Sequence, residues 1–252
     1  MDETRSTEAI FLSRFDYKDS DSLVNVYTPH EGRLTLLARG TKKPGSKLAG
    51  HIEPLTFADV MIIKGKGFDY LGSAITRQAY PGLRSDLNKL YYAGRVAALY
   101  LRQTEENVGD ERMFALLLEF LEVVNSLEVE EEFNKEKGSI IFAALLLKFL
   151  EENGHRPELF SCLACRQAVT PGDNIFDLLS GGIVCPDCRL TRQQIGESRL
   201  SDLVFISDDC IKLSRLLMSQ NLEFSLKIKA QKRVIDEVVK LWSSFLNFAM
   251  SG

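Results

Sequence analysis

Four cysteines arranged in two pairs are the residues of this chain best suited to chemistry. Cys162 and Cys165 form one Cys-x-x-Cys pair, Cys185 and Cys188 form the other, and nineteen residues separate the pairs. Each pair can turn both sulfurs toward one point, so two pairs together supply the four thiolates that Zn²⁺ prefers in a tetrahedral site. We therefore predict one zinc ion per chain, held by all four sulfurs.

The predicted zinc site is structural, because a closed shell of four thiolates leaves no open position for water or substrate. Between the pairs, turn residues at 172–174 and 180–182 flank a short apolar run at 175–179, which predicts a hairpin. The alternative, two disulfides, requires an oxidising compartment, and nothing in the sequence indicates one. We expect a zinc ribbon at about residues 160–192. The fifth cysteine, Cys210, lies in an apolar stretch and is expected to be a buried, small hydrophobic residue.

Patterns typical of enzymes are scarce. The three histidines, His30, His51 and His155, lie in predicted loops without a nucleophile in a known arrangement. Residues 40–47 lack the Gly-Lys-Ser/Thr order of a phosphate-binding loop, and Tyr70 occupies the place of the third glycine in a dinucleotide motif. We expect no catalytic residues and no nucleotide cofactor.

Length and composition indicate a soluble protein with one or two hydrophobic cores. The chain has 252 residues, 45% of them hydrophobic, which suffices for two domains or for one domain with an insertion. Its start is polar and unlike a secretory signal. The longest uncharged apolar run, residues 140–147, falls far short of the roughly 20 residues that span a bilayer. A cytoplasmic location follows, and reduced cysteines agree with it.

The first third of the chain predicts β structure. Five short runs rich in β-branched or aromatic residues alternate with turn residues, at 9–12, 23–27, 34–38, 57–63 and 71–75. Five such strands in a short sequence are typical of a small closed barrel, of which the OB-fold is the commonest kind. We assign residues 1–80 to this barrel domain.

Charge is unevenly distributed along the chain, although the net charge is only −4. Residues 33–77 hold eight basic and three acidic residues, whereas residues 105–136 hold two and eleven. Four of the basic residues lie in one segment between the third and fourth predicted strands, namely Arg39, Lys42, Lys43 and Lys47. Glycine and proline keep this segment irregular, so that side chains and backbone amides can reach an anion. On an OB barrel, such a segment is suited to follow the backbone of a nucleic acid strand.

Helical periodicity replaces the β pattern after residue 80. Apolar residues recur every three or four positions at 87–101, 113–124, 140–150 and 235–249. The run at 140–150 is apolar almost all round, which predicts the central helix of a bundle, and Gly154 and Pro157 end it. We expect these apolar faces to form a core; the alternative is a groove for a partner. The predicted fold class is α+β, with a helical domain at 81–252 that contains the zinc ribbon.

Two stretches of the chain resemble the RecO family of DNA repair proteins. The first resembles the family's N-terminal signature and comprises Val26-Tyr27-Thr28, Gly32-Arg33-Leu34, Ala38-Arg39-Gly40-Thr41-Lys42-Lys43-Pro44, Ser46-Lys47 and Glu53-Pro54-Leu55. The second resembles the helix that leads into the zinc site and the return from it, and comprises Phe142, Leu146 to Leu150, Gly154 to Leu159, Cys162 to Cys165 and Gly181 to Cys188. The match covers nearly the whole chain in the right order.

The resemblance implies a recombination mediator with an OB-fold domain and a helical domain into which a zinc ribbon is inserted. Such proteins bind single- and double-stranded DNA and anneal complementary strands. With RecR they help RecA to replace single-stranded DNA-binding protein, which implies a place in the cytoplasm at the nucleoid. The resemblance implies that DNA is contacted by Arg39, Lys42, Lys43 and Lys47, with Arg33, Lys64, Lys66 and Arg77 as weaker candidates. Aromatic residues available for stacking are Tyr27, Phe57, Phe68 and Tyr70.

A second function of another class stays open on the residues alone. A zinc ribbon and an OB barrel also suit an adaptor in transcription or RNA handling, whose barrel binds RNA and whose helices bind protein. Annealing of complementary DNA strands without ATP distinguishes the two functions.

Overall fold

A computed structural model describes residues 3–127, 134–194 and 202–250 of the chain. It divides into two compact units, Met1–Phe133 and Asn134–Gly252. The division falls after the third helix, whereas the predicted barrel domain ends at residue 80; that boundary stays a prediction.

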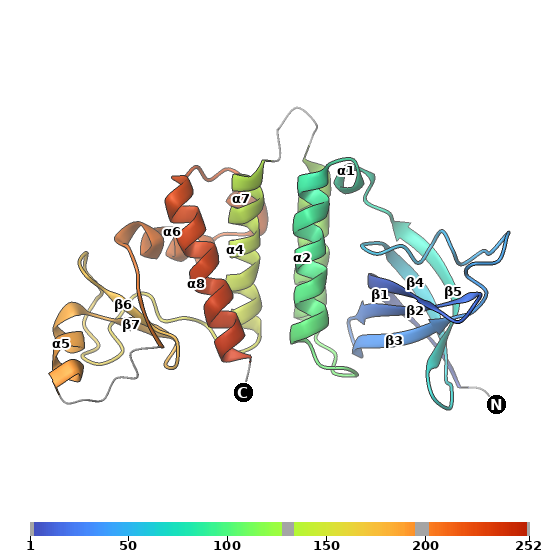
Figure 1. Ribbon diagram of the computed structural model, residues 1–252, viewed down its shortest axis with the longest axis horizontal. Coiled ribbons are helices and arrows are strands. Elements are labelled where there is room, and N and C mark those ends of the chain that lie inside the picture. Colours follow the sequence, from blue (N-terminus) through green and yellow to red (C-terminus); the bar gives the residue numbers. More distant parts are fainter. Residues whose placement is uncertain (1–2, 128–133, 195–201, 251–252) are drawn as a thin grey trace. The chain divides into compact units, whose positions relative to one another are not determined.

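The first unit begins with a closed five-stranded barrel (Figure 1). Its strands are β1 (Thr4–Tyr17), β2 (Asp21–Thr28), β3 (Gly32–Ala38), β4 (Phe57–Ile63) and β5 (Asp69–Gln78). They pair in the order β1-β2-β3-β5-β4, and β4 closes the barrel on β1. Only the contact between β3 and β5 is parallel among these pairs. The prediction of a five-stranded OB-fold barrel is confirmed.

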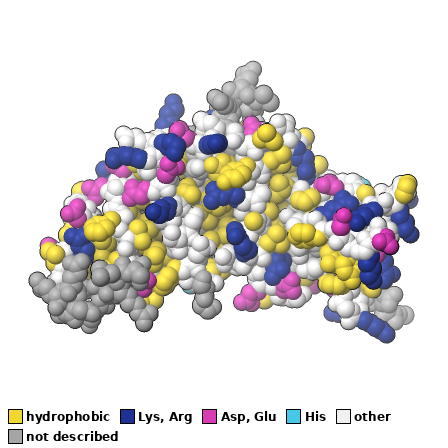
Figure 2. All heavy atoms as spheres, in the orientation of Figure 1, with side chains coloured by type: hydrophobic (Ala, Val, Ile, Leu, Met, Phe, Trp, Pro, Cys, Tyr) yellow, Lys and Arg dark blue, Asp and Glu magenta, His cyan; other side chains and the backbone are white. Residues whose placement is uncertain are grey.

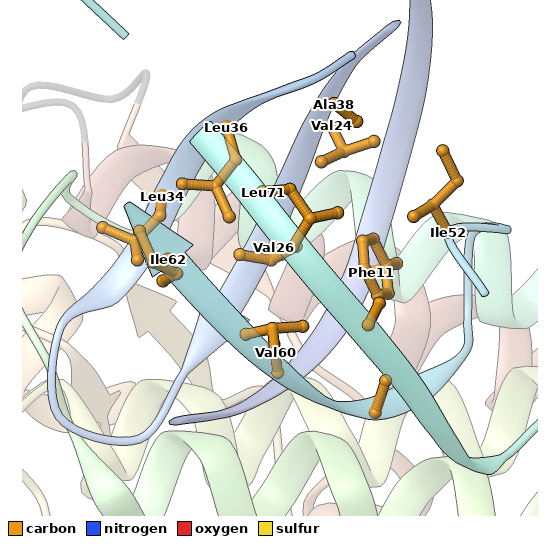
Figure 3. Close-up of a cluster of buried hydrophobic side chains, with 13 residues drawn as sticks. Phe11, Val24, Val26, Leu34, Leu36, Ala38, Ile52, Val60, Ile62 and Leu71 are labelled. Carbon is orange, nitrogen blue, oxygen red and sulfur yellow. The ribbon is translucent and has the colours of Figure 1, made fainter. Parts of the chain in front are cut away.

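Alternate residues of the strands fill the barrel interior, because successive side chains of a strand point to opposite faces. Figure 3 shows Phe11, Val24, Val26, Leu36 and their neighbours converging inside the barrel. The segment between β3 and β4 adds Ile52, which is fully buried, and Leu48 packs against the same cluster. This segment therefore contributes to the barrel core as well as holding the four predicted basic residues.

Three helices follow the barrel within the first unit, α1 (Pro81–Arg84), α2 (Leu87–Gln103) and α3 (Glu111–Ser126). Asp86 and Asp110 begin the two longer helices, since each carboxylate accepts hydrogen bonds from two amides of the first turn. The ring of Tyr27 on β2 meets that of Tyr100 on α2 edge-on, with centroids 5.1 Å apart. Aromatic contacts of this kind attach the helices to the barrel.

A close backbone approach makes a second attachment between the barrel and these helices. Gly32 in the β2–β3 turn has a φ of +64°, and a Cβ there would lie 1.9 Å from the carbonyl oxygen of Val108. A Cβ on Gly109 would lie 2.1 Å from the backbone of His30. Only glycine allows the hairpin and the α2–α3 loop to come this close.

The second unit is built around α4 (Lys135–Glu152), which packs against α6 (Asp208–Ser219), α7 (Leu222–Ser225) and α8 (Lys232–Ala249). Residues 140–147 of α4 are all buried, which confirms its prediction as the central helix of a bundle. The four predicted helical runs all form helices. Cys210 on α6 is fully buried, as predicted, and burial raises its pKa to about 12.

A small sheet is inserted between α4 and α6. It contains β6 (Ile175–Asp177), β7 (Gly182–Val184) and β8 (Leu203–Phe205) in the order β7-β6-β8, with α5 (Pro186–Gln194) after β7. The predicted hairpin is β6 and β7. The sequence predicts neither β8 nor α5, because three and nine residues are too short for a periodic pattern. Phe176 contacts Trp242 and Phe245 of α8, which joins the sheet to the bundle.

The fold class is therefore α+β, as predicted, with an OB barrel, a helical part and four close cysteines in an inserted ribbon. No helix among the described residues has both the length and the apolar character needed to cross a membrane.

Candidate nucleic-acid interface and metal centre

Three connections meet at one end of the barrel, which we call the loop end: the β1–β2 turn at 18–20, the segment 39–48 and the β4–β5 turn at 64–68. The backbone amide of Lys42 donates to the carbonyl of Ser20 across 3.1 Å. The rings of Tyr17 and Phe68 meet edge-on at 6.0 Å. The guanidinium of Arg39 lies 4.2 Å from the centre of the Tyr70 ring. The fold thus gathers three connections that are far apart in the sequence.

Arg39, Lys64 and Lys66 line one pocket at the loop end, together with Tyr70. The pocket has a volume of about 580 Å³. Both lysines are exposed, and neither makes an ion pair within the part of the chain that the structure describes. Two of the weaker candidates therefore lie beside Arg39, one of the four stronger ones.

The other three of the four stronger candidates, Lys42, Lys43 and Lys47, also lie on the segment 39–48. Lys43 and Lys47 are exposed and have no ion-pair partner among the described residues. Lys42 pairs with Asp16 at 3.0 Å, in a setting where the carboxylate is largely exposed. Such a surface pair contributes at most about 1 kcal/mol, so a phosphate can replace Asp16 as the partner of Lys42. Figure 2 shows dark-blue Lys and Arg side chains grouped over the barrel, with some acidic ones between them.

The backbone of this segment is held in place, whereas the side chains of Lys43 and Lys47 are exposed. Thr41 is buried, and its hydroxyl lies 2.8 Å from that of Ser22 on β2. The amide of Gly40 donates to the Asp21 carboxylate across 2.8 Å. Gly40 and Gly45 adopt positive φ angles of +67° and +78°, which few other residues tolerate. Anchored backbone and exposed lysines together make a preformed cationic surface.

The β4–β5 turn depends on Gly65. A Cβ at this position would lie 1.8 Å from the carbonyl oxygen of Phe68, so the turn requires glycine. The carboxylate of Asp69 accepts hydrogen bonds from the Gly65 amide at 3.1 Å and from Arg5 at 2.9 Å. Burial opposes the charge of Asp69, but these two donors outweigh it and lower its pKa. The turn holds Lys64 and Lys66 at the pocket.

Arg33 and Arg77, the two remaining candidates, lie away from the loop end. Arg33 is six residues before Arg39 on β3, about 20 Å along the strand. Its guanidinium donates to the Glu106 carboxylate at 2.8 Å and to the Thr104 carbonyl at 3.2 Å. Arg77, at the far end of β5, pairs with Glu8 and Asp59. Both arginines have acidic partners within the first unit and lie away from the loop end. The structure therefore does not group them with the other six candidates.

The predicted aromatic candidates also divide into two groups, one buried and one accessible at the loop end. Tyr27 and Phe57 are 2% and 8% exposed, which leaves no ring face for a base. Phe68 is 39% exposed, and Tyr70 lines the pocket. Phe15, which is 57% exposed, is not among the predicted candidates. A register shift in β1 between Phe11 and Ser13 reverses the alternation there, and no sequence pattern shows such a bulge.

The four cysteine sulfurs form the second candidate site. Their Sγ atoms all lie within 4.8 Å of one another, and those of Cys165 and Cys185 are 3.9 Å apart. Sulfurs at about 2.3 Å from a tetrahedral zinc ion are themselves about 3.8 Å apart. The residues present therefore fit a zinc ion.

The electrostatics of the cysteines also suit a cation. Burial of Cys162 opposes ionisation, but backbone N–H groups of Cys185, Cys165 and Ala164 point at its sulfur and lower its pKa to about 6. The nearby Cys185 sulfur raises the pKa of Cys188 to about 12. A divalent cation would stabilise all four thiolates at once. An all-sulfur shell leaves no place for a substrate, so the metal would hold the ribbon together.

Backbone pairing brings the two cysteine pairs to one point. The amide of Leu163 donates to the carbonyl of Ile183 on β7 across 2.8 Å. The amide of Glu158 donates to the carbonyl of Gly181 at 2.9 Å, and the amide of Ile183 donates to the carbonyl of Glu158 at 3.0 Å. The first pair thereby lies beside the strand that leads into the second pair at the start of α5.

Comparison with known proteins identifies the family of the chain. The family model described as "Recombination protein O N terminal" matches residues 1–80, and "Recombination protein O C terminal" matches residues 84–250. A protein named "DNA repair protein RecO" from Roseiflexus sp. (strain RS-1) is 32% identical over 97% of this chain and 81% of its own length. Relatives of the same name include one from Dehalococcoides mccartyi (strain ATCC BAA-2266 / KCTC 15142 / 195), 27% identical over 92% of this chain and 85% of its own. Another, from Alkaliphilus metalliredigens (strain QYMF), is 25% identical over 95% of this chain and 91% of its own. The chain therefore belongs to the RecO family of DNA repair proteins.

Proposed function

We propose that this protein binds single- and double-stranded DNA at the loop end of its barrel and anneals complementary strands. The observation that carries this proposal is that six basic residues on two separate connections lie at one end of the barrel: Arg39, Lys42, Lys43, Lys47, Lys64 and Lys66. The loops between the first and second and between the fourth and fifth strands are those with which OB-folds bind oligonucleotides. Family membership favours DNA over the RNA of the alternative function.

Annealing requires no bond to be made or broken. It requires a surface that neutralises two phosphate backbones while the base edges stay free to pair. Contacts from lysine and arginine to phosphates have this property, because they do not depend on base sequence. We propose that the protein acts in this way and not as an enzyme.

We further propose that the protein cooperates with RecR to load RecA onto strands coated by single-stranded DNA-binding protein, in the cytoplasm at the nucleoid. Family membership supports this role. Annealing of bare and of coated strands, with and without RecR, tests it. If RecR does not change annealing or RecA assembly on coated strands, the role is wrong.

The proposed zinc ion has a structural role in this function. The ribbon carries the four sulfurs, and its Phe176 packs on α8, so the metal would stabilise a part of the second unit. The proposed DNA contacts all belong to the first unit. One zinc ion per chain is therefore expected to support folding and not DNA contact.

The experiment that tests the DNA site compares two triple variants of equal charge. Lys42, Lys43 and Lys47 are replaced by Glu in one, and Lys212, Lys227 and Lys232 of the second unit are replaced by Glu in the other. Annealing of complementary oligonucleotides without ATP and binding at several salt concentrations are measured. We expect the first variant to lose annealing and most affinity, with a slope of log affinity against log salt reduced by about 0.7 per lost contact on single strands. Equal losses in both variants would refute the site.

A further inference from the structure

The outer face of the barrel carries an apolar row that ends at the cationic pocket. In the strand pairing, Phe15 of β1 lies opposite Leu23 of β2, Leu23 opposite Leu37 of β3, and Leu37 opposite Tyr70 of β5. We call these four residues the outer row. Directly paired residues share one face of a sheet, so the four side chains form a continuous line across the strands.

The row faces outward because its neighbours along each strand face inward. Val24, Leu36 and Leu71 belong to the buried core of the barrel, and each is adjacent in sequence to a row member. Leu37 in the middle is nearly covered, whereas Phe15 is 57% exposed and Tyr70 lines the open pocket. The accessible part of the row is thus aromatic at both ends.

We propose that the outer row is a stacking surface for unpaired bases, which makes Phe15 and Tyr70 the residues that distinguish single-stranded from duplex DNA. This inference rests on the proposed function and adds a specificity to its site. Bases of a single strand expose their faces to aromatic rings, whereas those of a duplex are covered by their neighbours in the stack. A ring surface therefore contributes affinity for single strands only.

Charge complementarity identifies the ligand of the row as a nucleic acid strand. Arg39, Lys64 and Lys66 border the Tyr70 end, and the two lysines have no ion-pair partner in the described structure. Arg39 already covers one face of Tyr70 at 4.2 Å and can bind a phosphate from the same position. Phe15 and Tyr70 are three strand spacings apart, about 14 Å, which a few nucleotides span. In Figure 2, yellow hydrophobic side chains lie among the dark-blue ones over the barrel.

Replacement of the rings tests the inference separately from the DNA site as a whole. The double variant Phe15→Leu with Tyr70→Leu keeps the surface apolar and removes both rings. We expect its affinity for oligo-dT to fall about tenfold or more, because each lost ring removes a surface on which a base stacks. Its affinity for a duplex of equal length and the salt slope for oligo-dT should stay unchanged, since no charge is lost.

Controls separate stacking from a change of fold. Tyr91→Leu removes a ring that is 60% exposed on α2, away from the row, and should leave oligo-dT binding unchanged. The double variant Phe15→Tyr with Tyr70→Phe keeps both rings and should therefore retain wild-type affinity. In Phe15→Trp, oligo-dT should quench the fluorescence of the new tryptophan. The chain's own tryptophan, Trp242, is fully buried and is thereby shielded from the oligonucleotide.

The outcomes distinguish this inference from the proposed function. If the double variant binds oligo-dT as the wild type does, or loses duplex and single-strand affinity equally, the outer row is not a stacking surface. If the wild-type protein binds neither DNA, the proposed function itself fails. A loss of affinity in the double variant that is confined to single-stranded DNA supports the inference, provided that the thermal unfolding midpoint is unchanged.

Discussion

Arg33 on β3 donates a hydrogen bond to Glu106 in the α2–α3 loop across 2.8 Å, and so links the barrel to residues that follow it by more than seventy positions. A second bond from the same guanidinium reaches the carbonyl of Thr104. This arginine lies in the part of the sequence that resembles the family's N-terminal signature. Its partners indicate that it stabilises the first unit.

Arg33→Ala is therefore expected to lower the free energy of unfolding by about 1 kcal/mol, a modest value because Glu106 is half exposed. DNA affinity should change little. Chemical denaturation and oligonucleotide binding measure the two effects. Arg39→Ala is the matched control and should show the reverse pattern, with affinity reduced and stability retained. A large loss of affinity in a folded Arg33→Ala protein would return Arg33 to the DNA site.

Gly65→Ala should disturb the β4–β5 turn, because the new Cβ would lie 1.8 Å from the carbonyl oxygen of Phe68. We expect a loss of about 1–3 kcal/mol in stability and a severalfold loss of DNA affinity, since Lys64 and Lys66 move with the turn. Gly67→Ala in the same turn is the control, because nothing lies within 4 Å of its Cβ. Similar behaviour of the two variants would show that the turn does not position the lysines.

Removal of the metal should loosen the ribbon and leave the barrel intact. Reduced protein is expected to contain about one zinc ion per chain, and Cys162→Ser should lose it. Limited proteolysis should then cleave the ribbon, while DNA affinity largely persists. Cys210→Ala, which changes a buried cysteine outside the cluster, should keep the zinc. Loss of DNA binding in a folded Cys162→Ser protein would assign the ribbon to the DNA site.

The ion pair of Asp69 with Arg5 should make the first unit sensitive to acid. Burial alone would raise the pKa of Asp69, but the Gly65 amide and Arg5 lower it below the ordinary value. Ionised Asp69 thus stabilises the folded state above the ordinary carboxyl pKa of about 4, and this stabilisation is lost as the pH falls through the lower, folded pKa. Asp69→Asn should reduce stability at neutral pH by about 1 kcal/mol and flatten its decline between about pH 5 and pH 3. Asp19→Asn in the exposed β1–β2 turn is the control, and an equal effect there would contradict the assignment.

The sequence by itself determined those features that depend on nearby residues. Two Cys-x-x-Cys pairs and the turns between them predicted the ribbon, and the alternation of apolar residues predicted the five barrel strands and the long helices. The cluster of Arg39, Lys42, Lys43 and Lys47 was visible because those residues are close in the chain. Each of these signals is local, since the geometry of a strand, helix or knuckle repeats within a few residues.

Only the tertiary structure decided which distant residues meet. Lys64 and Lys66 join Arg39 because β5 pairs with β3 in parallel, whereas Arg33 and Arg77 lie at the opposite ends of these same strands and find acidic partners. The bulge in β1 turns Phe15 outward into line with Tyr70. Strand order, register and bulges arise from packing between segments that are far apart in the chain, and no local pattern records them.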